Sequence, residues 1–590
     1  MSNLDATNSA TDLIKQAAAW GHPAIAITDH ANVQAFPEAY HAAQDLGIKV
    51  LYGVEAYLVN DGEPVAYHPT DIDLTSATYV VFDVETTGLS SVYDRMIELA
   101  AVKMREGQVV DSFEAFINPN RTLSSFTTEL TGITNDMVNK ADQEEVVLER
   151  FYEFSKGTIL VAHNASFDMS FLNKGYQRMG LEPSQAPVID TLELSRMVNP
   201  HLKSHRLNTL AKRYNISLEQ HHRAVYDSET TGYLMYKLLD QAREDYGMVN
   251  HQDLNNRLGQ GEAYKKARPF HATLLVKTQT GLKDLFKLIS EANVNYFHRV
   301  PRVPRSLLNK YRDHLLVGSA CSEGELFTTM MQKGYEETKE LARYYDYIEI
   351  MPKAAYLPLL HDGNLQSERE LEDIISNLYH LGKELNIPVV ATGNVHYLDP
   401  KDAIYREVIQ RSLKINQTRD LVLPQVHFRT TDEMLDDFAF LGHDGAQEVV
   451  IDNSQAIAES IESIQVIKDD LFSPNIEGAE EEITDLTYQR AHELYGENLP
   501  EIVEKRIEKE LKSIISNGFA VIYLISQKLV LKSNEDGYLV GSRGSVGSSL
   551  VATFTGITEV NPLAPHYHCP QCKYSHFYTC LLYTSPSPRD

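Results

Sequence analysis

Short apolar runs alternate with amphipathic segments over the first 60 residues of the chain. The stretch "ATDLIKQAAAWGHPAIAIT", residues 10–28, predicts a helix, a Gly-Pro break and a short strand that ends at "TDH". A second helix, "FPEAYHAAQDLG", and a strand, "IKVLYGVEAYLV", follow. This alternation is typical of α/β packing with a largely parallel sheet.

The rhythm breaks at the polar stretch "NDGEPVAYHPTDIDLTSA", and we predict a domain boundary near residue 75. Residues 76–245 then form a self-contained block, with strands "TYVVFDVE", "RMIELAAVKM" and "SFEAFINP" and a final helix "DSETTGYLMYKLLDQARE". After a polar link, the first α/β rhythm resumes in "FHATLLVKT", "HLLVGSACSEGELF", "YDYIEIMP" and "PVVATGNVHYL". The pattern therefore predicts an outer α/β domain, residues 1–75 and 255–434, that is split by an inserted α/β domain.

From residue 435 to 577 the pattern becomes mostly helical. An acidic stretch, "IEGAEEEITD", predicts a solvated link. A Gly/Ser-rich loop follows a short apolar segment, "GYLV", which we expect to be a strand, and precedes a helix-like run. A cysteine pair comes after it.

Composition narrows the class of protein. A length of 590 residues suggests roughly three to five domains, and 43% hydrophobic and 23% charged residues are ordinary for a globular chain. Four cysteines cannot form a disulfide framework, and no run of 18 apolar residues occurs, so we expect a cytoplasmic protein without a membrane partner. The formal charge of −28 disfavours a nucleic-acid ligand but does not exclude one, because acids can hold metal ions while basic residues line one groove.

Two acids one residue apart, Asp83 and Glu85, end the apolar run "TYVVFDVE". Side chains at i and i+2 of a strand point to the same face, so the two carboxylates can share a cation. Exposed strand ends carry such pairs often. Two further segments add weight: "TILVAHNASFDMSFL" places Asp168 near a helix start, and "HHRAVYDSETTGYL" places His222 five residues before Asp227, just ahead of another helix.

Four carboxylates suit two hard divalent cations, which stabilise the attacking and leaving oxygens of a displacement at phosphorus. A nearby histidine can accept a proton from the attacking water at neutral pH. The segments "FDVETTGL", "HNASFD" and "HRAVYD" resemble the three motifs of the DEDD exonucleases, in the branch with a histidine. The resemblance implies an RNase H-like fold and 3′→5′ hydrolysis of single-stranded DNA ends.

The resemblance to the DEDD exonucleases further implies that Asp83, Glu85, Asp168 and Asp227 hold two Mg²⁺ or Mn²⁺ ions. His222 would be the general base. Thr86, Thr87 and Leu89, on the turn after the first acids, are the implied contacts for the terminal nucleotide. His163 and His221 are expected to be structural.

In the outer domain, five predicted strand ends carry a His, Glu or Cys, in "AITDHANVQ", "YGVEAYL", "FHATLLVKT", "GSACSEGELF" and "ATGNVHYLDP". Their order resembles the PHP domain, a metallo-phosphoesterase fold of bacterial replicative polymerases. The resemblance implies an α/β barrel and Zn²⁺ or Mn²⁺ ligands at Asp5, His30, Glu55, His271, Cys321 and His396. The opening H-x-H motif of that family is absent, and Asn394 stands where active members carry an acid, so a purely structural role is the alternative.

The Gly/Ser loop "GSRGSVGSS" offers backbone N–H groups, hydroxyls and one arginine to a phosphate, but no G-K-[ST] follows, so it is not a Walker loop. A split PHP domain, a DEDD insertion and this loop together resemble the layout of PolC-type DNA polymerase III alpha subunits. The resemblance implies that residues 435–577 begin a polymerase palm and that a nucleoside triphosphate contacts Gly541, Ser542, Arg543, Gly544 and Ser545.

In that family the pair Cys569 and Cys572 is half of a zinc site. Two thiolates cannot close a tetrahedral site, so zinc is expected only if other ligands join. The palm aspartates are expected beyond residue 577, and residues 578–590 fit neither the family nor a folded element. A sliding clamp and other replisome subunits are the implied partners. A non-catalytic module that braces a polymerase remains an alternative, and a free-standing repair exonuclease is disfavoured because it has no need of "GSRGSVGSS".

Overall fold

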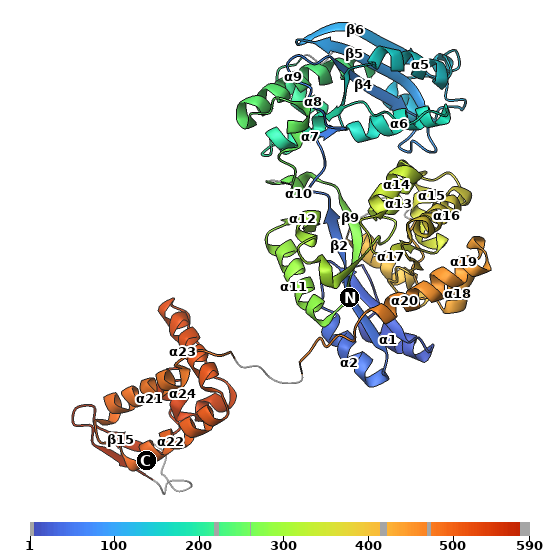
Figure 1. Ribbon diagram of the computed structural model, residues 1–590. Coiled ribbons are helices and arrows are strands. Elements are labelled where there is room, and N and C mark those ends of the chain that lie inside the picture. Colours follow the sequence, from blue (N-terminus) through green and yellow to red (C-terminus); the bar gives the residue numbers. More distant parts are fainter. Residues whose placement is uncertain (1–4, 217–223, 260, 414–421, 469–473, 579–590) are drawn as a thin grey trace. The chain divides into compact units, whose positions relative to one another are not determined.

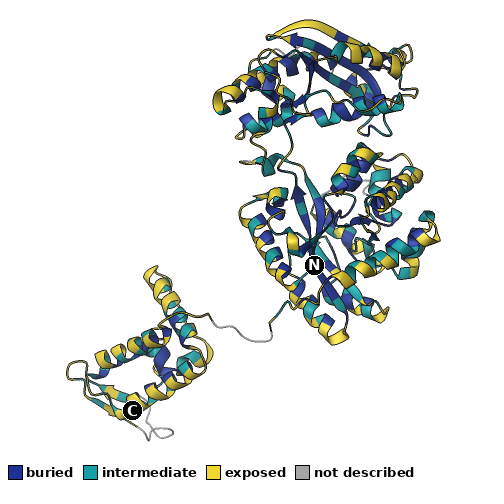
Figure 2. Cartoon of the chain, in the orientation of Figure 1, coloured by how far each residue is buried: buried dark blue, intermediate teal, exposed yellow. Residues whose placement is uncertain are grey.

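The structure is a computed structural model that describes residues 5–216, 224–259, 261–413, 422–468 and 474–578. The chain divides into two compact units, Met1–Ile467 and Lys468–Asp590. The first unit holds two sheets of six strands, and its buried strands are flanked by helices whose outer faces are exposed (Figure 1, Figure 2).

The inserted domain of the first unit is built on a mixed sheet. Its strands, in spatial order, are β3 (Ala66–Tyr67), β8 (Val188–Asp190), β7 (Ile159–Ala162), β4 (Tyr79–Thr86), β5 (Met96–Arg105) and β6 (Gln108–Phe116). Its helices are α3 (Ser125–Thr131), α4 (Asn135–Val138), α5 (Glu144–Ser155), α6 (Ala165–Arg178), α7 (Thr191–Val198), α8 (Leu207–Arg213) and α9 (Ala224–Tyr246). The strands and the final helix predicted for this block are therefore confirmed.

Strand β4 lies inside this sheet, and the run Tyr79–Phe82 is almost fully buried. Tyr79 and Val81 pack into the core beneath α9, whereas Val80, Phe82 and Val84 pack into the core beneath α5 and α6. A strand covered on both faces reads as a continuous apolar run, which explains why "YVVF" shows no alternation. By the same alternation, Asp83 and Glu85 lie on the α9 side.

The outer part of the first unit contains a second sheet. Its path is β10 (Phe297–His298), β11 (Val300–Pro304), β2 (Lys49–Val59), β9 (Pro269–Val276) and β12 (Leu315–Gly318), with β1 (Ala24–His30) paired to β2. The helices of this part are α1 (Ala10–Ala19), α2 (Phe36–Leu46), α10 (Ala263–Lys266), α11 (Gln279–Val294), α12 (Arg305–Leu308), α13 (Glu325–Gln332), α14 (Tyr335–Ala342), α15 (Leu357–His361), α16 (Glu368–Leu385) and α17 (Ala403–Ser412).

The predicted α/β barrel is not closed among the described residues. Strands β13 (Ile348–Ile350) and β14 (Val389–Ala391) form a separate parallel pair, which meets the main sheet only through a single bridge from Gly318 to Tyr347. No described strand pairs with the free edge of β1, and β13 and β14 span only three residues each. The outer domain is thus a mixed α/β sheet with an open seam between β1 and β14.

Two segments near the predicted domain limits pack with the neighbouring part of the first unit. Strand β3 precedes residue 75 but pairs with β8, and Val65 and Leu74 belong to the same core as Leu234. At the other end, α18 (Thr431–Asp437), α19 (His443–Gln447) and α20 (Asn453–Ser460) follow residue 434. Of these, α18 contributes Met434 and α19 contributes Ala446 to the core of the first unit. The domain limits themselves stay a prediction.

The second unit is mainly helical, as predicted. It contains α21 (Ala479–Tyr495), α22 (Glu501–Ser516), α23 (Ala520–Glu535), α24 (Leu550–Phe554) and the hairpin β15 (His566–His568) and β16 (Ser575–Phe577). The acidic stretch expected as a link instead starts α21, where Glu480, Glu481 and Glu482 fill the first turn and favour the positive end of the helix dipole.

No single helix among the described residues is long and apolar enough to cross a membrane. The helices α22 and α23 reach the required length and composition only as a pair, which bends by 109°.

Candidate active site

The crevice of the inserted domain forms where β7 stops beside β4. The two parallel strands pair only from Tyr79 to Val81, so β4 continues alone on that side toward Asp83 and Glu85. On the other side, antiparallel β5 places Ala100 opposite Asp83 and Glu98 opposite Glu85. Sites of α/β sheets commonly lie in such a crevice at the carboxyl ends of strands.

Asp168 reaches this crevice from the first turn of α6. Its side chain is buried, and its Oδ1 accepts a hydrogen bond from the main-chain N–H of Val84 at 3.2 Å. Asn164 precedes the helix in a left-handed conformation, with φ of 78°. The carboxylate of Asp190 accepts hydrogen bonds from the N–H groups of Asn164 (3.2 Å) and Ala165 (2.9 Å), and so anchors the start of α6.

Asp227 lies in the first turn of α9, so this acid lies at the start of a helix, as predicted. The next residue, Ser228, donates a hydrogen bond to the main-chain oxygen of either Ala100 (3.2 Å) or Ala224 (2.7 Å). Ala100 is the partner of Asp83 in β5, so this contact brings the first turn of α9 over the acid pair. Helix α9 can approach strand β5 closely because residue 232 is glycine. A Cβ at this position would lie 2.1 Å from the Sδ of Met104.

The electrostatics of the site are those of crowded, buried carboxylates. Burial, and then the charges of Asp168, Glu85 and Asp227, raise the pKa of Asp83 well above its usual range. Burial also raises the pKa of Asp168 well above its usual range, and burial together with Glu98 and Asp227 raises the pKa of Glu85 to about 7. Such mutual repulsion is relieved by a cation with a preference for oxygen ligands, so the residues present fit a divalent metal site.

Glu98 is an acid of this site that the sequence interpretation missed. It is fully buried in β5, opposite Glu85, and it contributes to the raised pKa of both Asp83 and Glu85. The signal was present as a glutamate inside the apolar run "RMIELAAVKM", because an acid in a buried strand requires a polar neighbour.

The structure describes only some of the remaining residues predicted for this site. His222, the predicted general base, and His221 lie outside the described residues. Thr86 ends β4, and Thr87 and Leu89 lie on the turn after it, with Leu89 65% exposed; their role as nucleotide contacts stays a prediction. His163 lies within hydrogen-bond distance of the Thr191 hydroxyl (2.9 Å) and the His205 main-chain oxygen (3.0 Å), and burial lowers its pKa to about 4.

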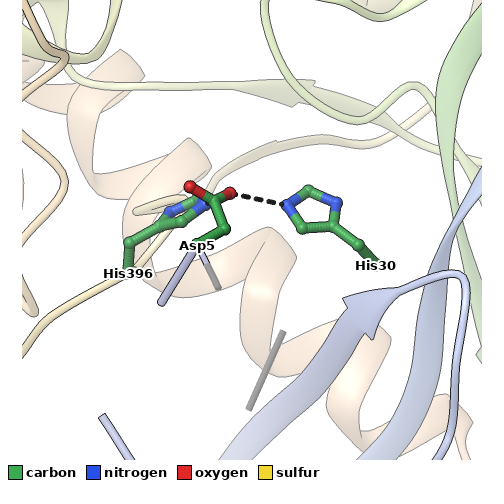
Figure 3. A group of neighbouring side chains, drawn as sticks. All are labelled: Asp5, His30 and His396. Carbon is green, nitrogen blue, oxygen red and sulfur yellow. Dashed lines mark hydrogen bonds and ion pairs between the residues drawn. The ribbon is translucent and has the colours of Figure 1, made fainter. Parts of the chain in front are cut away.

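All six residues predicted for the outer domain converge beside the open seam. The Oδ2 of Asp5 lies 3.3 Å from His30 Nε2 and 3.0 Å from His396 Nε2 (Figure 3). The Oε1 of Glu55 lies 3.3 Å from His30 Nδ1 and also contacts His271. The Sγ of Cys321 lies 3.1 Å from His271 Nδ1. We call these six residues the outer cluster: Asp5, His30, Glu55, His271, Cys321 and His396.

Two side chains of the outer cluster, His30 and Cys321, have strongly raised pKa values. Burial opposes charge on His30, but hydrogen bonds to Asp5 and Glu55 overcome it and raise the pKa of His30 to about 10. Burial raises the pKa of the Cys321 thiol well above its usual range. On its other oxygen, Asp5 accepts hydrogen bonds from Arg406 (2.9 Å) and Gln410 (2.7 Å) of α17. A cavity of about 590 Å³ adjoins the outer cluster.

In the second unit, the predicted nucleotide loop is exposed. Residues Tyr538–Arg543 are irregular, and Leu539 is 98% exposed, so the expected strand "GYLV" is wrong. A 3₁₀ turn, Gly544–Ser548, follows and leads into α24. Gly541, Ser542, Arg543, Gly544 and Ser545 are all exposed; the Thr558 hydroxyl donates a hydrogen bond to Ser542 Oγ at 2.9 Å. Without packing partners, an apolar tetrapeptide cannot hold a strand.

Cys569 and Cys572 lie at the turn of the β15–β16 hairpin. Within the described part of the chain, no further His, Cys, Asp or Glu joins them in a group able to hold a metal. Backbone N–H groups of Cys572 and Gln571 lower the pKa of the Cys569 thiol. Cys580 and the rest of residues 579–590 lie outside the described residues.

Two family models match this chain. The model described as "Exonuclease" matches residues 80–235, and the model described as "Bacterial DNA polymerase III alpha NTPase domain" matches residues 481–577. The first match spans β4, α6 and the first half of α9, which carry the four acids. Residues 80–235 are therefore an exonuclease-family domain.

Sequence similarity to two relatives covers nearly the whole chain. It is 60% identical over 580 residues to "DNA polymerase III PolC-type" of Latilactobacillus sakei subsp. sakei and 57% identical over 580 residues to that of Bacillus subtilis. Each match covers 98% of this chain and 40% of the relative. The chain thus corresponds to about two fifths of a PolC-type DNA polymerase III.

Solved structures with similarity to this chain include "Exonuclease X in complex with 5′ overhanging duplex DNA", with 26% identity and a TM-score of 0.25 over 30% of this chain and 99% of that one. Another is the nuclease domain of 3′hExo, described as a DEDDh family member bound to rAMP, with 19% identity and a TM-score of 0.26 over 30% of this chain and 98% of that one.

Proposed function

We propose that the inserted domain hydrolyses DNA from its 3′ end with two divalent cations, Mg²⁺ or Mn²⁺, and proofreads for a PolC-type polymerase. The single observation that carries the proposal is the convergence of Asp83, Glu85, Asp168 and Asp227 at one crevice, with the first three held as carboxyl groups of raised pKa. An arrangement so costly to ionise is retained where cations compensate it.

In this proposal the four carboxylates hold the cations, which supply charge stabilisation to the attacking and leaving oxygens at phosphorus. The main-chain N–H of Val84 orients Asp168 toward the crevice through their hydrogen bond. Thr86, Thr87 and Leu89 hold the terminal nucleotide of a single strand, and His222 takes the proton of the attacking water.

The test is hydrolysis of a 5′-labelled single-stranded oligonucleotide by the purified 590-residue chain with Mg²⁺ or Mn²⁺. Single-nucleotide shortening from the 3′ end is expected, and a chelator abolishes it. Asp83→Asn is expected to lose about a hundredfold or more of the rate, because a neutral amide ligates a hard cation poorly. Equal shortening by Asp83→Asn and the parent chain would refute the site.

We further propose that the outer domain is of the PHP type and that the outer cluster binds Zn²⁺ or Mn²⁺. The observation in favour is that histidine nitrogens, carboxylate oxygens and a thiol lie within reach of one another, a donor set that suits Zn²⁺. Metal content after dialysis, compared between the parent chain and His271→Ala, tests this directly.

For the whole polymerase, we propose that residues 435–577 begin the palm and that the exposed loop Gly541–Ser545 meets a nucleoside triphosphate. DNA, a sliding clamp and replisome subunits are the proposed partners of the whole protein. Protection of Arg543 from trypsin by a nucleoside triphosphate is a first test of this loop.

A further inference from the structure

The turn that connects β4 to β5 lies against the outer domain. It carries Thr87 and Leu89 on one side and the buried residues Ser90 and Ser91 on the other. Leu89 is 65% exposed, whereas Ser91 is completely buried, so neighbouring residues face solvent and protein respectively. A serine with no exposed surface needs partners for its polar groups, and these come from outside the inserted domain.

The partners are the last carbonyl groups of helix α13. The Ser90 hydroxyl donates a hydrogen bond to the main-chain oxygen of Met331 at 2.6 Å. Both the N–H group (2.8 Å) and the hydroxyl (3.1 Å) of Ser91 donate to the main-chain oxygen of Gln332. The final carbonyls of a helix have no partner within it, so the inserted domain caps an outer-domain helix at its C-terminus.

Three more contacts hold the turn on both sides. Arg178, at the end of α6, donates to the main-chain oxygen of Ser91 at 3.3 Å. Tyr93 packs against the core of the outer part. Gly334, just after α13, approaches so closely that a Cβ there would lie 3.1 Å from Val92 Cγ2.

Within the turn, Asp94 links Ser90, which is bound to α13, to Thr87, one of the predicted nucleotide contacts. One carboxylate oxygen accepts from the Thr87 hydroxyl at 3.0 Å and the other accepts from the Ser90 N–H at 3.0 Å. The main-chain N–H of Thr87 also donates to the Arg95 carbonyl at 2.9 Å. Ser90 and Thr87 therefore donate to the same carboxylate. A displacement of Ser90 would move Asp94 and, through it, Thr87.

Helix α13 is a rigid base for the turn that connects β4 to β5. Seven of its eight residues, Glu325 to Met331, are buried, and Tyr345 donates a hydrogen bond from its hydroxyl to Glu325 at 2.9 Å. A helix buried on all sides has little freedom to move relative to its surroundings.

We propose that the C-terminal end of α13, through Ser90 and Ser91, positions the turn Thr86–Asp94 so that Thr87 and Leu89 can bind the terminal nucleotide. The inference rests on the proposed exonuclease function and adds positioning residues to it: Ser90 and Ser91 in the inserted domain, and the segment Met331–Gly334 in the outer domain. Exonuclease substrate binding then depends on the fold of the outer domain, although no described outer-domain side chain reaches the acids.

The test compares two glycine variants of the full chain. Gly334→Val places a Cβ 3.1 Å from Val92 Cγ2, closer than an ordinary van der Waals contact, so Val92 has to shift. Gly363→Val is the control, because Gly363 also has a positive φ (72°, against 101° at Gly334) but a Cβ added to it would have no atom within 4 Å. KM and kcat are measured on a single-stranded oligonucleotide, with the Mn²⁺ concentration for half-maximal activity as a second readout.

Gly334→Val is expected to raise KM roughly tenfold, with kcat and the Mn²⁺ requirement nearly unchanged, because ground-state binding is lost while the acids stay in place. Gly363→Val is expected to keep the parent KM. A parent KM in Gly334→Val would overturn the inference, whereas an inactive parent chain would instead refute the proposed function.

A second variant keeps the inference testable if Gly334→Val does not fold. In Ser90→Ala/Ser91→Ala the two hydroxyl hydrogen bonds to α13 are removed while the Ser91 N–H contact remains. A smaller rise in KM, about threefold, is expected. Loss of the Mn²⁺ response in this variant, or a KM equal to that of the parent, would overturn the positioning role.

Discussion

Val84 and Asp168 are joined by a hydrogen bond of 3.2 Å from the main chain of one to the carboxylate of the other. The bond connects the strand that ends in the first acid pair with the helix that brings the third acid. It fixes one carboxylate oxygen of Asp168 and leaves the other for a cation. The same bond lowers the cost of ionising Asp168, while burial raises it more.

Replacing Asp168 by asparagine is expected to affect activity and stability in opposite directions. The asparagine oxygen can still accept from Val84, but one charge is removed from a buried group of repelling carboxylates. We expect hydrolysis to fall about a hundredfold and the melting temperature in chelator to rise. Asp136→Asn, on the exposed surface of α4, is the control and is expected to change neither quantity. A melting temperature lower than that of the parent would contradict the electrostatic account.

The stability of the metal-free inserted domain is expected to fall as pH rises. The pKa of Glu85 is about 7 in the folded state against 4.5 as its ordinary value, so the native state binds more protons between these values. Stability is then highest below pH 4.5 and decreases toward pH 7, by up to about 3 kcal/mol from this group alone. Thermal unfolding with chelator from pH 5 to 8 measures the slope, and saturating Mg²⁺ is expected to flatten it. A stability that increases over this range would disprove the assignment.

Glu98→Gln is expected to shift the acid limb of the pH–rate profile to lower pH. The substitution keeps the shape of the buried side chain but removes a charge that raises the pKa of both Asp83 and Glu85. The carboxylates then ionise, and bind cations, at lower pH. Glu114→Gln, on the exposed strand β6, should leave the profile in place. An unchanged acid limb in Glu98→Gln would show that Glu98 does not act on the acids proposed to bind metal.

Arg406→Met is expected to destabilise the outer domain by roughly 3 kcal/mol. The guanidinium is buried and donates two hydrogen bonds to Asp5 Oδ1, so its removal takes one fixed positive charge and two hydrogen bonds away from the Asp5 carboxylate. Arg411→Met removes an exposed pair with Glu407 on the same helix and is expected to cost less than about 0.5 kcal/mol. Denaturant unfolding of the two variants measures the difference, and equal midpoints would contradict the role of Arg406.

The sequence was most informative where local rules and tertiary structure agree. The continuous apolar run before Asp83 predicted a buried strand, and the pattern around Asp168 predicted a strand followed by a helix; both are confirmed because each element is long enough to bury its own face. The barrel was not predictable in the same way, because β13 and β14 are too short to decide which edges join.

Other features depended on partners distant in the sequence. "GYLV" was wrong as a strand because no described strand pairs with it, and the acids of "GAEEEI" form a helix start rather than a link because of their position at the N-terminus of α21. The contact of Ser90 and Ser91 with α13 was not predictable, because a serine pair in the sequence is typical of a solvent-exposed turn.

The antiparallel pairing of Val59 with Pro269 also constrains the order of folding. These residues flank the whole inserted segment, so β2 cannot find β9 until that segment has been synthesised. Closing a flexible loop of this length is entropically costly, although each doubling of length adds only about 0.6 kcal/mol. A folded inserted domain holds its two ends in fixed positions and so replaces a long flexible loop by a short one. The exonuclease domain is therefore expected to fold first and to hold the ends of β2 and β9 close together, which allows the outer sheet to assemble.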